Sequence, residues 1–174
     1  MFLTEGYIGD SFAVGRKHEM ARIATLVKNW EMGFRGTLLI SGSRFSGKTF
    51  LGTMVHNQHF KNNTIEVTPN QTIRLQGRTF ETAYNLKEAL NFIIKYGLQS
   101  KSMIWIDDLV KWESESVTLA SNVKHLMGMM DAYSNRLFFV VSMSNRLRKQ
   151  LNRFYELEKG FQAVLDIDSI PFQD

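Results

Sequence analysis

The residues best suited to chemistry lie in one short stretch, 38–49, which contains the pattern G-x-x-x-x-G-K-[ST] as Gly42, Gly47, Lys48 and Thr49. Glycines at both ends let the backbone turn sharply and approach an anion closely. The N–H groups between them then point at the anion, helped by the positive end of the helix that follows. This stretch therefore predicts a phosphate-binding loop.

Each polar residue of this loop has an expected task. Lys48 brings a positive charge to the outer phosphates, and the Thr49 hydroxyl is placed to ligate Mg²⁺. An ordinary glycine- and serine-rich turn is the alternative, but the apolar strand before the loop and the helix after it favour phosphate binding. We expect the nucleotide to contact the whole loop: Gly42, Ser43, Arg44, Phe45, Ser46, Gly47, Lys48 and Thr49.

Two carboxylates follow a second apolar run. Met103–Ile106 has the composition of a strand buried on both faces, and Asp107 and Asp108 come directly after it. At the ligand-binding edge of a parallel sheet, Asp107 would hold the Mg²⁺ shell. Asp108 would orient or deprotonate the water that attacks the γ-phosphate. The structural alternative is an aspartate that only caps a loop.

A third polar cluster, 142–145, follows the apolar run Leu137–Val141. If this strand lies between the other two, a polar residue at its end would reach both the water and the γ-phosphate. We prefer Asn145 to Ser142 for this task. Asn145 has a structural alternative as the cap of a helix that begins at Leu147.

Apolar periodicity predicts alternating helices and strands around these motifs. The expected helices are a helix from Arg16 to the glycines at 33 and 36, and helices over 47–56, 82–98, 116–133 and 147–157. The expected strands are 37–41, 103–106, 137–141 and 163–167. Residues 58–80 form either a hairpin that turns at Pro69-Asn70 or one core strand with an extended excursion. This order predicts an α/β fold, a three-layer α-β-α sandwich with a mainly parallel sheet.

Composition sets the remaining limits. The chain has 174 residues, 44% hydrophobic and 22% charged, as expected for one soluble globular domain. It has no cysteine, no apolar run long enough for a membrane span and no signal-peptide pattern, so we expect a cytoplasmic location. A net charge of +4, from 21 basic and 17 acidic residues, permits DNA binding without indicating it.

The order of these motifs resembles the nucleotide-binding core of AAA+ ATPases and of their relatives, the STAND NTPases, from about residue 8 to the end. The resemblance implies a P-loop NTPase fold of the ASCE type, with five strands in the order 5-1-4-3-2. It implies an adenine pocket lined by Val14, Gly15 and Arg16, with Asn145 as the first sensor. Arg153 would act on the nucleotide of a neighbouring subunit, although a solvated basic helix face explains this arginine equally well.

The sequence departs from the family pattern at two points, and both bear on the expected ATPase activity. Most AAA+ enzymes have Asp-Glu where this chain has Asp107-Asp108, and the shorter side chain lies about 1.5 Å farther from a water. The helical lid that carries the second sensor arginine of the family has no counterpart in residues 1–174. We therefore expect a single core domain that is a fragment of a longer chain and a weak ATPase in isolation.

The functional expectation is a domain that binds ATP or ADP with Mg²⁺ and uses binding and slow hydrolysis as a conformational or assembly switch. Its expected partners are further copies of the chain or another protein, through the face that carries Arg153, and no membrane. The sequence argues against a GTPase, because neither Asn-Lys-x-Asp nor Thr-Lys-x-Asp, the motifs that recognise guanine, is present. A small-molecule or nucleotide kinase and a non-hydrolysing ATP-dependent scaffold are the alternatives, the scaffold presenting residues 58–80 to a partner.

Overall fold

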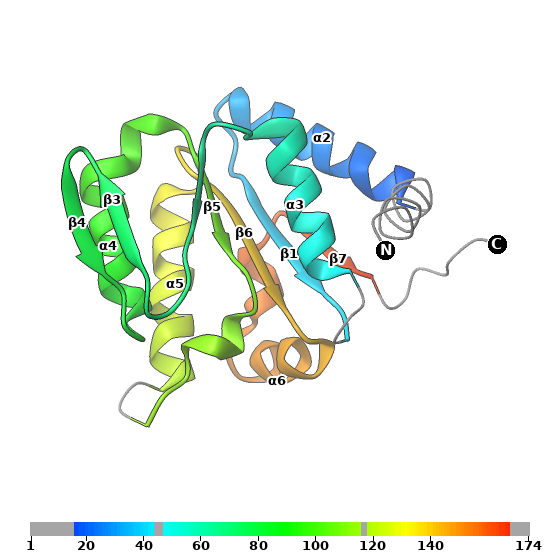
Figure 1. Cartoon of the computed structure of the whole chain (residues 1–174). Helices are drawn as coiled ribbons and strands as arrows, with labels where there is room; N and C mark the ends of the chain where they lie inside the picture. Colours follow the sequence, from blue (N-terminus) through cyan, green and yellow to red (C-terminus); the bar gives the residue numbers. More distant parts are fainter. Residues whose placement is uncertain (1–15, 44–46, 116–117, 168–174) are drawn as a thin grey trace, which may run out of the picture.

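The computed structural model describes residues 16–43, 47–115 and 118–167 (Figure 1). Short links join its helices and strands. In chain order these are α2 (Lys17–Glu31), β1 (Thr37–Ser41), α3 (Lys48–His59), β2 (Thr64–Glu66), β3 (Thr72–Leu75), β4 (Arg78–Glu81), α4 (Leu86–Gly97), η1 (Leu98–Ser100), β5 (Met103–Ile106), η2 (Leu109–Trp112), α5 (Leu119–Tyr133), β6 (Phe138–Met143), α6 (Asn145–Tyr155), η3 (Leu157–Gly160) and β7 (Ala163–Asp166).

Five of the strands form one sheet in the order β2-β5-β6-β1-β7, and every neighbouring pair is parallel. Read from β7 and numbered along the chain without β3 and β4, this order is 5-1-4-3-2. The central strand β6 pairs with β1 on one side and with β5 on the other. The predicted α/β sandwich with a mainly parallel sheet is therefore confirmed.

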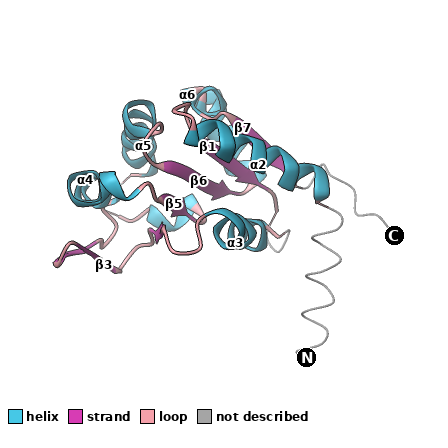
Figure 2. Ribbon diagram, turned by 90° about the horizontal axis from the view of Figure 1, so that it is seen from above, coloured by secondary structure: helices cyan, strands magenta, loops and turns pink. Residues whose placement is uncertain are grey.

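Helices cover both faces of this sheet, as a parallel sheet requires (Figure 2). Every residue of β1, β5 and β6 is buried, and successive side chains enter opposite faces. One face packs against α2 and α3, and the other against α4, α5 and α6. Because these strands contact apolar side chains on both sides, they are continuous apolar runs in the sequence.

The predicted element bounds hold best for the buried strands. β1 and β5 have the predicted bounds, whereas β6 continues two residues further, to Met143, and so includes Ser142. The helix expected from residue 82 begins at Leu86, because the Asn85 side chain caps it by accepting a hydrogen bond from the Glu88 backbone N–H. Among the described helices, none combines the length and apolar character that a bilayer crossing requires.

Residues 58–80 follow the second of the two expected arrangements. β2 joins the edge of the main sheet, and β3 pairs with β4 in a separate antiparallel hairpin. A hairpin turning at Pro69-Asn70 is wrong, because the chain turns at Gln76 and Gly77, where φ is 52° and 74°. Two consecutive positive φ angles are typical of the tight hairpin turn that matches strand twist. The hairpin lies beside α4 (Figure 1), where Phe80 stacks on Phe92 with ring centroids 5.5 Å apart.

The spacing between α3 and the sheet depends on Gly52. A Cβ at this position would lie 2.5 Å from Cζ2 of Trp105, which belongs to β5 and is only 7% exposed. Because the Trp105 ring is enclosed, it has little space to yield. The close approach holds the start of α3, which follows the phosphate loop, beside the end of β5, which precedes Asp107.

Replacing Gly52 with alanine is therefore expected to lower the free energy of unfolding by about 1–3 kcal/mol, since the added methyl overpacks a filled site. Gly128 of α5 is the matched control, because a Cβ there meets no atom within 4 Å. Gly128→Ala should raise stability by up to about 1 kcal/mol through helix propensity alone. Urea unfolding of both variants measures the difference, and equal stability of the two would contradict this packing constraint.

Candidate nucleotide-binding site

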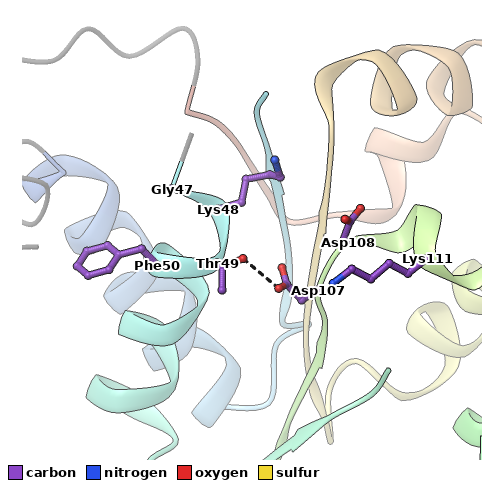
Figure 3. A pocket seen from close by; sticks show the side chains of 7 residues that line it. All are labelled: Gly47, Lys48, Thr49, Phe50, Asp107, Asp108 and Lys111. Carbon is purple, nitrogen blue, oxygen red and sulfur yellow. Dashed lines mark hydrogen bonds between the residues drawn. The ribbon is translucent and has the colours of Figure 1, made fainter. Parts of the chain in front are cut away.

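The parallel sheet brings the predicted motifs to one edge. In the sheet register Ile40 lies beside Ser142, and Ile106 lies beside Val141, so β1, β6 and β5 end close together. The phosphate loop leaves β1 at this edge, and Asp107 leaves β5. A cleft of about 430 Å³ opens between them, lined by Gly47, Lys48, Thr49, Phe50, Asp107, Asp108 and Lys111 (Figure 3).

The described part of the phosphate loop has the backbone geometry that its glycine permits. Gly47 has φ of 101°, a left-handed conformation that glycine adopts readily, and it caps the start of α3. The Lys48 ammonium donates hydrogen bonds to the carbonyl oxygens of Gly42 at 2.9 Å and Ser43 at 2.8 Å. The ammonium therefore lies over the first residues of the loop.

The Asp107 carboxylate is held by two hydroxyl groups from different elements. Thr49 Oγ1, on α3, donates to Asp107 Oδ2 at 3.0 Å, as the dashed line in Figure 3 marks. Ser142 Oγ, on β6, donates to Asp107 Oδ1 at 2.6 Å. A threonine hydroxyl beside a carboxylate is a pair of oxygen ligands of the kind that Mg²⁺ uses together with substrate phosphates. Such a site needs few protein ligands, and the described residues contain no cluster of three or more histidine, aspartate or glutamate side chains suited to a metal.

Asp108 has an unusual backbone conformation that fits its place beside the cleft. Its φ is 64° and its ψ is 80°, in the left-handed region that aspartate tolerates better than most residues. Its backbone N–H donates to Ser142 Oγ at 2.8 Å. Ser142 therefore forms hydrogen bonds with both consecutive aspartates. These hydrogen bonds hold the turn through which the chain passes from β5 into η2.

Asn145, the sensor residue that the sequence favours over Ser142, joins a polar network between α6 and β7. It is the first residue of α6, and Ser144 caps that helix by accepting a hydrogen bond from the Leu147 backbone N–H. Asn145 Nδ2 donates to Asp166 Oδ1 at 3.0 Å, and Asn145 Oδ1 accepts from Arg148 at 3.3 and 3.2 Å. The sensor role of Asn145 stays a prediction.

The other predicted site residues are spread around this centre. Arg16 is buried and donates from Nη2 to the carbonyl oxygen of Ile167 at 3.3 Å, beside the end of β7. Arg153 is exposed in the last turn of α6, followed by Phe154 with 67% exposure. Its proposed action on a neighbouring subunit stays a prediction. Five predicted residues lie outside the described part of the chain: Val14, Gly15, Arg44, Phe45 and Ser46.

Phe50 and Lys111 also line the cleft, and sequence reasoning did not select them. Phe50 follows the G-K-T triplet directly, so its position on the first turn of α3 was available as a signal. Lys111 carried no such signal, because its place in the cleft depends on the turn at Asp108.

Ser142→Ala is expected to lower the free energy of unfolding by about 1–3 kcal/mol, since it leaves the part-buried Asp108 N–H and one Asp107 oxygen without this partner. Ser41 is the matched control. It is equally buried, at 0% exposure, on the neighbouring strand, and its hydroxyl has no hydrogen-bond partner among the described residues. Ser41→Ala should therefore change stability by less than about 0.5 kcal/mol. Denaturant unfolding compares the two, and a Ser142→Ala variant as stable as Ser41→Ala would refute the role of this hydroxyl.

Comparison with known proteins finds similarity only at the level of structure. No protein-family model matches the chain, and no curated protein matches it by sequence. The solved structure of the Aeropyrum pernix ORC2 protein in its ADPNP–ADP complexes is similar with a TM-score of 0.57 and 15% identity. The structure of Drosophila ORC bound to AT-rich DNA and Cdc6 is similar with a TM-score of 0.54 and 13% identity.

These alignments cover 87% and 99% of this chain but only 47% and 62% of the chains that they match. The chain therefore spans about half to three fifths of those structures. At such low identity the likeness shows the fold alone. Together with the strand order, it shows that this chain shares the fold of those structures, an α/β sandwich around a parallel five-stranded sheet.

Proposed function

We propose that this domain binds ATP with Mg²⁺ and hydrolyses it slowly, as a conformational or assembly switch of the AAA+ or STAND type. The observation that carries the proposal is the 3.0 Å hydrogen bond between Thr49 Oγ1 and Asp107 Oδ2. It joins two motifs that are far apart in the sequence and that together would form a magnesium–phosphate site. The solved ORC2 structure with ADPNP and ADP supports a nucleotide ligand for this fold.

Different residues of the cleft would bind the phosphates and the metal ion of the nucleotide. The loop N–H groups and the Lys48 ammonium bind the phosphates, and Lys48 exchanges its contacts with Gly42 and Ser43 for phosphate oxygens. Thr49 and Asp107 would hold Mg²⁺, which neutralises charge on the phosphates when bound. Ser142 would keep the Asp107 carboxylate oriented if the Thr49 hydroxyl gave up its hydrogen bond to Asp107 for a metal ion.

Asp108 is the candidate group for the attacking water. Its carboxylate lines the cleft, and the Ser142 contact fixes its backbone. An aspartate reaches less far than the glutamate usual in AAA+ enzymes, and a displacement of about 1 Å can cost on the order of 100-fold in rate. The Asn145 side chain is engaged by Asp166 and Arg148, which also favours slow hydrolysis.

The exposed face of α6 is the proposed surface for assembly. Arg153 and Phe154 are both exposed there, and Arg146 and Lys149 add positive charge to the same helix. An arginine on such a surface can reach the phosphates of a nucleotide held by an adjacent copy. The switch would then couple nucleotide state to contacts between copies or with a partner protein.

Lys48→Ala is expected to weaken ATP binding by about 10- to 100-fold, the range for loss of a charge-assisted hydrogen bond to phosphate. Titration calorimetry with Mg²⁺ and ATP measures the affinity. Lys124→Ala, an exposed lysine of α5, is the control and should bind like the wild type. Unchanged ATP affinity in Lys48→Ala would overturn the proposed binding site.

Replacing Asp107 or Asp108 with asparagine should affect different properties, namely the Mg²⁺ dependence of ATP binding and the rate of hydrolysis. Asp107→Asn should remove most of the difference between ATP affinities measured with Mg²⁺ and with a chelator, because it removes a metal ligand. Asp108→Asn should keep that difference and slow hydrolysis by about 100-fold or more, as for loss of a general base. Hydrolysis that persists in Asp108→Asn would contradict its role, and phosphate transfer to an added small acceptor would favour a kinase.

A further inference from the structure

A second lysine lies in the cleft, on the wall opposite the phosphate loop. Lys111 belongs to η2 and lines the same cleft as Lys48, Asp107 and Asp108. In Figure 3 its side chain extends from η2 toward Asp107, whereas Lys48 enters from α3 on the other side. The cleft therefore presents one ammonium group from each wall.

The backbone that carries Lys111 is held firmly. The turn at Asp108 directs the chain into η2, and the Lys111 N–H closes that turn by donating to the Asp108 carbonyl oxygen at 3.1 Å. Leu109 and Trp112 are both 0% exposed, so they anchor the turn in the core on either side of Lys111. The Trp112 carbonyl also accepts a buried hydrogen bond from Asn122 Nδ2 on α5 at 3.2 Å. The backbone of Lys111 is thus fixed, whereas its side chain is exposed.

The charge of Lys111 is available to a ligand. Within the described part of the chain, no carboxylate oxygen lies within 4.0 Å of its ammonium nitrogen, and that nitrogen makes no hydrogen bond. The cleft already contains the carboxylates of Asp107 and Asp108. A bound triphosphate would add several negative charges beside these two carboxylates. A second cation, on this wall, would offset the part of their electrostatic repulsion that Lys48 does not offset.

The position on the wall indicates which phosphate Lys111 would contact. If the phosphate loop and Lys48 hold the nucleotide from the α3 side, its terminal phosphate would lie in the cleft that β5 and η2 line on the other side. We propose that Lys111 contacts the terminal phosphate of a bound nucleoside triphosphate and so makes the site favour ATP over ADP. This inference rests on the proposed function and adds a cation from the same chain that senses the γ-phosphate.

Lys111→Met tests the proposal, because methionine retains much of the aliphatic side chain and removes the charge. With Mg²⁺ present, binding of a non-hydrolysable ATP analogue should weaken about 10-fold, and binding of ADP less than about 2-fold. Lys111→Arg keeps the charge and should preserve most of the preference for the triphosphate. Lys124→Met is the matched control, an exposed lysine of α5 outside the cleft, and should leave both affinities unchanged.

The outcomes separate this inference from the proposed function. A wild-type chain that binds neither nucleotide refutes both. Wild-type binding that requires Lys48, combined with an unchanged ratio of ATP to ADP affinity in Lys111→Met, overturns only the role of Lys111. Equal weakening of both nucleotides also overturns it, since a general charge effect does not depend on the terminal phosphate. The thermal midpoint of Lys111→Met should equal that of the wild type, because its side chain is exposed and makes no ion pair among the described residues.

Discussion

The parallel pairing of β6 between β1 and β5 is the constraint on which the cleft depends. Parallel strands end at the same edge, so the pairing brings the exit of the phosphate loop, Ser142 and Asp107 together. The pairing requires both faces of the sheet to be covered, because backbone and apolar groups of three central strands would otherwise contact water. Two layers of helices meet this requirement, and they also carry Lys48 and Thr49 to the edge.

Within that frame, one carboxylate organises the cleft. Asp107 accepts hydrogen bonds from α3 and from β6, and the same Ser142 hydroxyl fixes the backbone of Asp108. Charge-assisted hydrogen bonds of this kind are stronger than neutral ones, and several on one carboxylate restrict its orientation. The turn at Asp108 then directs Lys111 back over the cleft. The buried Ser142 hydroxyl thereby links Asp107 to Asp108 and, through the turn at Asp108, to the segment that carries Lys111.

A second polar network stands beside the first and restrains α6. Arg148 is only 12% exposed and forms ion pairs with Glu158 at 2.8 Å and Asp166 at 3.2 Å. Asn145 joins this network, and Asp166 is the register partner of Ser41, the last residue before the phosphate loop. The network connects the helix that carries Arg153 to the strand beside the loop.

The sequence by itself determined the buried strands and predicted the phosphate loop, because residues buried on both faces must be apolar and a backbone phosphate cradle requires glycine at fixed spacing. It did not determine the strand partners of residues 64–81, since short alternating segments suit an edge strand and a hairpin equally. Nor did it determine whether Ser142 or Asn145 meets Asp107, or that Lys111 enters the cleft. Those contacts depend on where β6 ends and on one left-handed turn at Asp108, and only the packed sheet sets both.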